Sequence, residues 1–63
     1  MNMTSVDFVV GEHKVNITKV KGIPDPYTMW YHCNDTCKRY PNQHSLKSAI
    51  AEARRILREK NHA

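Results

Sequence analysis

Aromatic and basic side chains are concentrated between residues 30 and 40. Aromatic rings stack on bases and Lys and Arg neutralise phosphates, so this combination is typical of nucleic-acid binding. Further cations recur at helical spacing between residues 47 and 58, on a stripe that contains no acid. The candidate nucleic-acid-binding residues are Trp30, Lys38, Arg39 and Tyr40 in the first segment and Lys47, Arg54 and Arg58 in the second.

The charge distribution favours an anionic partner. Residues 1–31 carry three acids and three bases, whereas residues 32–63 carry three acids and seven bases, which gives the net charge of +4. A one-sided basic surface attracts polyanions, although it also serves as a solubilising surface. The alternative for Trp30 and Tyr40 is a place in the core, because a small core needs its large residues.

Two cysteines and nearby histidines are the candidate metal ligands. Zinc prefers Cys and His at short spacing, and Cys33, Cys37 and His44 fit that pattern loosely, with His32 or His13 as a fourth ligand. No second Cys pair completes a zinc motif, so we predict no metal site. The sequence leaves open whether Cys33 and Cys37 are free, bridged or metal-bound.

No catalytic signature is present. The sequence contains no nucleophile elbow, Gly-rich phosphate loop or Cys–His–acid order, and a chain of 63 residues has little material to enclose a substrate. We therefore expect no enzymatic activity and no cofactor. The longest aliphatic and aromatic run is residues 8–10, which predicts no membrane association and a cytoplasmic location.

The elements that must position these residues are short strands followed by one helix. Alternating apolar residues and turn signals predict strands at about 5–10, 14–20, 27–33 and 37–40, with residues 41–44 as a connector. Apolar residues at helical spacing predict a helix over about 46–61, with Ser45 as its N-cap. The fold class is α+β: a three- or four-stranded antiparallel β-meander packed against one C-terminal amphipathic helix, in a single domain.

The loop at residues 34–36 determines which side chains of the second hairpin share a face. With a three-residue loop, Cys33 faces Cys37, His32 faces Lys38 and Trp30 faces Tyr40, whereas a two-residue loop shifts each pairing by one. We expect the three-residue register. We also expect Met29, Tyr31 and Cys33 to face the helix, which leaves an outward set of Trp30, His32, Lys38 and Tyr40; the reverse assignment is the alternative.

In layout, the segments Tyr27–Cys33, Cys37–Tyr40 and Ser45–Ala53 resemble the small amino-terminal DNA-binding domains of phage-type integrases and AP2-like domains. The resemblance covers about residues 14–60, and the turn lacks the usual Gly-rich character. It implies a sheet packed on one helix, laid in the DNA major groove, with Trp30, His32, Lys38 and Tyr40 meeting DNA.

The leading functional hypothesis is a small non-enzymatic nucleic-acid-binding protein, more specifically DNA-binding, with an accessory or regulatory role in a phage or mobile element. The alternative is a protein–protein interaction module that binds a host or partner protein through a sheet edge or an exposed aromatic patch. A homodimer is compatible with both, because association would cover sheet surface in a chain with a small core.

Overall fold

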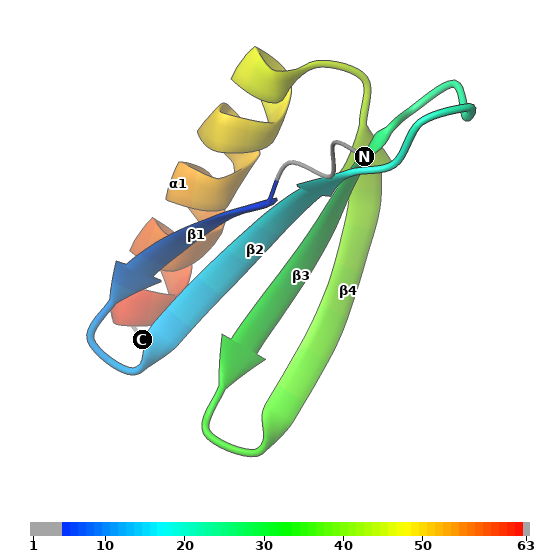
Figure 1. Ribbon diagram of the computed structural model, residues 1–63. Helices are drawn as coiled ribbons and strands as arrows, with labels where there is room; N and C mark the ends of the chain where they lie inside the picture. Colours follow the sequence, from blue (N-terminus) through cyan, green and yellow to red (C-terminus); the bar gives the residue numbers. More distant parts are fainter. Residues whose placement is uncertain (1–4, 63) are drawn as a thin grey trace.

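The protein is a four-stranded antiparallel sheet with one helix across one face (Figure 1). A computed structural model describes residues 5–62. The strands are β1 (Ser5–Val10), β2 (His13–Lys19), β3 (Tyr27–Cys33) and β4 (Thr36–Gln43), in the order β1-β2-β3-β4, and the helix is α1 (Leu46–His62). The α+β meander with a C-terminal helix is therefore confirmed, and it has four strands. No helix among the described residues is long and apolar enough to cross a membrane.

The hairpins β1–β2 and β3–β4 each turn through two residues. Gly11 and Asn34 open these loops at φ values of 59° and 52°, the left-handed conformation that Gly and Asn adopt most readily. Because Asn34 adopts it, the second loop closes over two residues and Cys33 already pairs with Thr36. The expected three-residue register is thus wrong, and every pairing is shifted by one.

This shift in pairing determines which side chains of β4 lie on each face of the sheet. Residues directly opposite in antiparallel strands lie on the same face. Tyr40 pairs with Met29 and Lys38 pairs with Tyr31, so Lys38 and Tyr40 lie on the helix side of the sheet. The prediction that these two residues face outward is wrong for this reason. The opposite face carries Trp30 with its partner Arg39 and His32 with its partner Cys37.

Strand β4 continues through the expected connector to Gln43. Pro41 is tolerated there because β4 is at the edge of the sheet, and the pairing with β3 shifts between Tyr27 and Met29, where the extra β4 residue is accommodated. The side chain of Gln43 then accepts a hydrogen bond from Ser48 in the first turn of α1, which ties the end of the strand to the helix.

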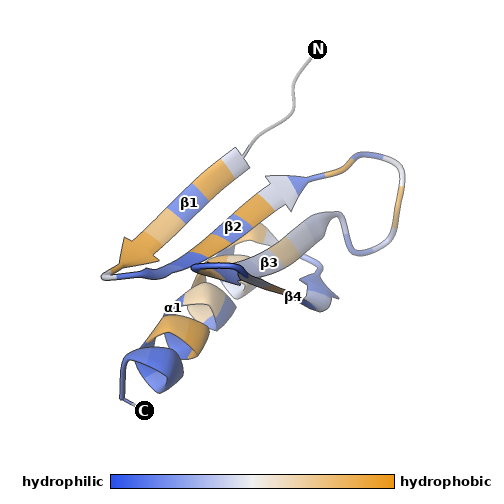
Figure 2. Ribbon diagram, turned by 90° about the horizontal axis from the view of Figure 1, so that it is seen from below, coloured by the Kyte–Doolittle hydropathy of each residue, from blue (hydrophilic) through white to orange (hydrophobic). Residues whose placement is uncertain are grey.

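The core lies between α1 and the inner face of the sheet. Figure 2 shows the apolar residues interspersed with polar ones along β1, β2 and α1. Ala49 and Ala53 are fully buried, so the small side chains let the helix backbone approach the strands closely. Ser45 caps the helix as expected: its hydroxyl accepts a hydrogen bond of 3.1 Å from the Ser48 backbone N–H. The buried side chains are Val15, Ile17, Met29, Tyr31, Ala49, Ala53, Ile56 and Leu57, which confirms that Met29 and Tyr31 face the helix.

Candidate nucleic-acid interface

The seven predicted binding residues do not form one surface. They fall into three places: the uncovered face of the sheet, the helix side of β4, and the side of α1 next to β1. The members of these groups are Trp30 and Arg39, then Lys38 and Tyr40, then Lys47, Arg54 and Arg58.

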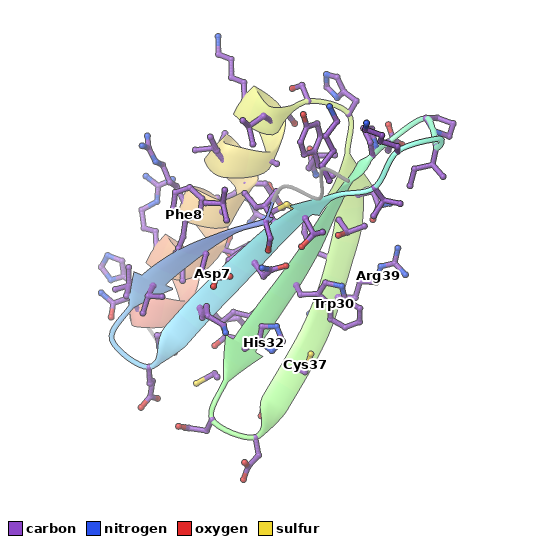
Figure 3. All side chains as sticks on the ribbon, in the orientation of Figure 1. Asp7, Phe8, Trp30, His32, Cys37 and Arg39 are labelled. Atoms are coloured by element: carbon purple, nitrogen blue, oxygen red, sulfur yellow. The ribbon has the colours of Figure 1, made fainter. Side chains whose placement is uncertain are left out.

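Trp30 and Arg39 form a pair on the uncovered face (Figure 3). The guanidinium carbon of Arg39 lies 5.9 Å from the centroid of the Trp30 ring, within the range of a cation–π contact. Nη2 of Arg39 also donates a 3.2 Å hydrogen bond to Oδ1 of Asn42. Trp30 keeps 36% of its surface exposed. The indole of Trp30 and the side-chain amide of Asn42 thus hold the Arg39 guanidinium in place above the sheet.

Polar side chains cover the β1–β2 part of the same face. Asn16 is at its centre: Nδ2 donates to Ser5 Oγ at 2.9 Å and to Asp7 Oδ1 at 2.7 Å. The Thr18 hydroxyl donates to Asn16 Oδ1 at 2.7 Å. Asp7 is thereby engaged within the sheet, as its position in Figure 3 also indicates.

The sequence reasoning missed most of this polar surface. The cross-strand pairs Lys14 with His32, Asn16 with Trp30 and Thr18 with Thr28 all lie on the uncovered face. The signal was available in the alternation of β2, where Lys14, Asn16 and Thr18 alternate with the buried Val15 and Ile17.

The second group lies on the helix side of β4. The Lys38 ammonium is 5.0 Å from the centroid of the Tyr40 ring, and Tyr40 packs against the hydrophobic core. Tyr40 is therefore partly a core residue, as the alternative in the sequence interpretation allowed. Neither residue shares a face with Trp30.

The third group borders an apolar groove between α1 and β1. Phe8, Val10 and Leu57 line one part of the groove together with Arg54 and Arg58. Leu46, Ile50 and Ala51 line a second hollow along α1 with Lys47 and Arg54, so that Arg54 borders both hollows. The three cations are exposed, and no ion pair within residues 5–62 involves them. The groove thus combines an apolar floor with a purely basic rim.

The other exposed stripe of α1, which carries Glu52, Arg55 and Glu59, is paired within itself. Arg55 contacts Glu52 through two guanidinium nitrogens and donates to Glu59 Oε2 at 2.6 Å. The hydrogen bond from Arg55 lowers the pKa of Glu52, and the same contacts raise the pKa of Arg55. This stripe offers no unpaired guanidinium to a ligand.

The candidate metal ligands Cys33, Cys37 and His44 are not brought together. Both cysteines are free. In the observed register Cys33 pairs with Thr36 and Cys37 pairs with His32, so the two thiols lie on opposite faces of the sheet. This arrangement excludes a disulfide between them within one chain. The thiol of Cys33 lies instead near Glu12 and His13.

Comparison with protein-family models, with curated proteins and with solved structures found no match to the chain. The resemblance to integrase amino-terminal domains and AP2-like domains therefore stays a prediction. The functional proposal rests on the geometry of the described residues.

Proposed function

We propose that this protein binds nucleic acid through the uncovered face of its sheet, as a small non-enzymatic accessory or regulatory protein. The observation that carries the proposal is the Trp30–Arg39 pair, which presents a fixed guanidinium beside an exposed indole. An Arg fork pairs with phosphate oxygens or with the O6 and N7 edge of guanine. An exposed aromatic ring provides a stacking surface for a base.

The charges on this face support a position for the nucleic acid away from the β1 edge. The carboxylate of Asp7 is in β1 at one edge of the sheet and accepts a hydrogen bond from Asn16. Lys14 follows in β2, His32 in β3 and Arg39 in β4 at the other edge. A phosphate backbone is therefore attracted towards Lys14 and Arg39 and away from Asp7.

The basic stripe of α1 does not belong to this interface. Arg54 and Arg58 lie beside β1 on the helix layer, with Lys47 further along α1, and Trp30 and Arg39 are on the other side of the sheet. One ligand strand would have to wrap around the edge of the sheet to meet both groups. A cation on the sheet face can therefore be tested for nucleic-acid binding, with a cation of the α1 stripe as its control.

The test compares two single charge removals of the same kind. Fluorescence anisotropy would measure the affinity of Arg39→Ala and Arg54→Ala for a labelled DNA duplex and a labelled single strand at low salt. We expect Arg39→Ala to weaken binding about tenfold, from the loss of a guanidinium that meets phosphate or a base. Arg54→Ala removes the same net charge and should change affinity less than about threefold.

Amide NMR shifts upon titration would locate the contact. Shifts on residues 14–18, 28–32 and 37–42 that weaken steeply with salt are expected. Equal losses of affinity in the two variants, or amide shifts confined to α1, would mean that the helix belongs to the interface and would contradict the proposal. Absence of any shift with either oligonucleotide at low salt would refute nucleic-acid binding.

A second candidate function follows from the groove between β1 and α1. Its apolar floor and its rim of Lys47, Arg54 and Arg58 are complementary to an amphipathic segment that carries acidic residues beside apolar ones. A second copy of α1 is a poor occupant, because its apolar face is already packed against its own sheet. The corresponding function is binding of an acidic partner protein.

This candidate has its own test. A synthetic helix with leucines on one face and flanking glutamates would be titrated against the protein, with a matched peptide in which each glutamate is lysine. The acidic peptide should shift the amides of β1 and α1 and bind at least about tenfold more weakly to Arg54→Glu with Arg58→Glu. Arg39→Ala should leave its affinity unchanged. Equal binding of both peptides would refute the charge-complementary groove.

A further inference from the structure

Three ligand types meet where the β1–β2 loop adjoins the end of β3. His13 at the start of β2 and Cys33 at the end of β3 are cross-strand partners on the helix side of the sheet. Glu12 immediately precedes His13 in the two-residue loop. One ligand atom from each side chain, a carboxylate oxygen, an imidazole nitrogen and a thiol sulfur, lies within 4.8 Å of the other two.

The spacing of these atoms matches a small tetrahedral ion. The Cys33 thiol donates to Glu12 Oε2 with the sulfur and oxygen 3.6 Å apart. In tetrahedral zinc, with Zn–S about 2.3 Å and Zn–O about 2.0 Å, the sulfur-to-oxygen edge is about 3.5 Å. The pair is thus already at a separation that a bound zinc ion requires.

Neighbouring groups orient two of the three ligands. Nδ1 of His13 lies 2.7 Å from the Tyr31 hydroxyl, and the two rings stack with centroids 5.9 Å apart and an interplanar angle of 21°. Metal-bound imidazoles are commonly held in this way by a polar partner. Nδ2 of Asn34 lies 3.9 Å from the Cys33 sulfur and donates to it, which orients this side chain at the site.

We infer that Glu12, His13 and Cys33 bind a divalent transition metal of the zinc type, with water as the fourth ligand. Sulfur and imidazole nitrogen disfavour calcium and magnesium, which take oxygen ligands. Binding replaces the thiol proton of Cys33 with the metal and releases that proton to solvent. The ion would fasten the β1–β2 loop to the end of β3, so metal binding would stabilise the edge hairpin.

The experiment uses the full chain, reduced and stripped of metal. Cobalt(II) is titrated first, because coordination by a thiolate produces a sulfur-to-cobalt charge-transfer band and intense visible absorption. Zinc is then titrated by calorimetry and competition. We expect one metal per chain, a rise in melting temperature with zinc, and no comparable effect of magnesium.

Matched variants identify the ligands. Cys33→Ser and His13→Asn should weaken zinc binding by more than about tenfold, the lower bound expected for losing even a group that only orients a ligand. Cys37→Ser and His44→Asn remove the same atom types elsewhere and should bind as the unaltered protein does. If Cys33→Ser does not fold, the zinc-induced change in the side-chain ¹⁵N shifts of His13 in the unaltered chain decides the question.

Three results would overturn the inference. No cobalt charge-transfer band at millimolar metal would mean that the thiolate does not bind it. A loss of affinity in Cys37→Ser or His44→Asn equal to that in Cys33→Ser would point to a different ligand set. A stoichiometry of one metal per two chains would show bridging between molecules.

Discussion

At the residue scale, Trp30 and Tyr31 show how one strand divides its aromatic side chains. Trp30 stays at the surface under Arg39, whereas Tyr31 is 5% exposed and belongs to the core. The hydroxyl of Tyr31 still finds a partner in His13, so its burial leaves no polar atom unsatisfied.

The burial of Tyr31 predicts a loss of stability in alkali. Burial, followed by the influence of the neighbouring Cys33, raises the pKa of Tyr31 from 10.0 to about 12. The folded protein therefore holds the phenol proton more tightly than the unfolded chain does. This stabilisation is fully present below pH 10 and is lost as the pH rises through 12.

Urea unfolding of the unaltered protein and Tyr31→Phe from pH 8 to 12 would measure this effect. The variant should lose about 1 kcal/mol at pH 8 with the hydrogen bond and show a smaller decline above pH 10. Parallel declines in the two proteins would show that Tyr31 does not titrate in this range.

At the element scale, the packing of α1 depends on two alanines. Ala53 is fully buried against the sheet, whereas Ala51 is exposed beside the groove. We expect Ala53→Leu to reduce the free energy of unfolding by about 1–3 kcal/mol, because the added carbons have no space. Ala51→Leu is the control with the same composition, and thermal melting should show almost no change. A stable Ala53→Leu variant would mean that the helix can move away from the sheet at little cost.

The helix and strands were predictable from the sequence where the repeat of apolar residues is long and uninterrupted. The apolar repeat of α1 extends over several turns, so its bounds and its cap at Ser45 followed from spacing alone. The end of β4 did not follow, because Pro41 is normally a strand breaker and only its edge position permits it. The register did not follow either, since loop lengths of two and three residues both fit the segment 34–36.

At the scale of the whole molecule, the uncertainty of one residue in the length of the β3–β4 loop explains why the predicted residues of β3 and β4 do not share one surface. Strand alternation separates Arg39 from Lys38 and Tyr40, but only the register decides that Arg39, and not the other two, shares a face with Trp30. The cations of α1 were recognised as a stripe, but their position beside β1 arises from tertiary packing. Of the Glu12–His13–Cys33 cluster, Cys33 and His13 were among the candidate ligands, but Glu12 was missed and the grouping was not foreseen, because the three are close only once β2 pairs with β3.

The two-residue loop at Asn34–Asp35 has a consequence for how this surface could evolve. Two-residue loops are the favoured hairpin connection, so deletion of the single codon for Asp35 would re-close the turn over Asn34 and Thr36. Cys37 would then oppose Cys33, and Tyr40 would oppose Trp30 on the uncovered face, while Arg39 would turn towards the helix. A nuclear Overhauser contact between Trp30 and Tyr40 would report the exchange. One in-frame deletion thus exchanges the set of β4 side chains on the uncovered face without altering any of them, a larger step than any point mutation in β4 can make.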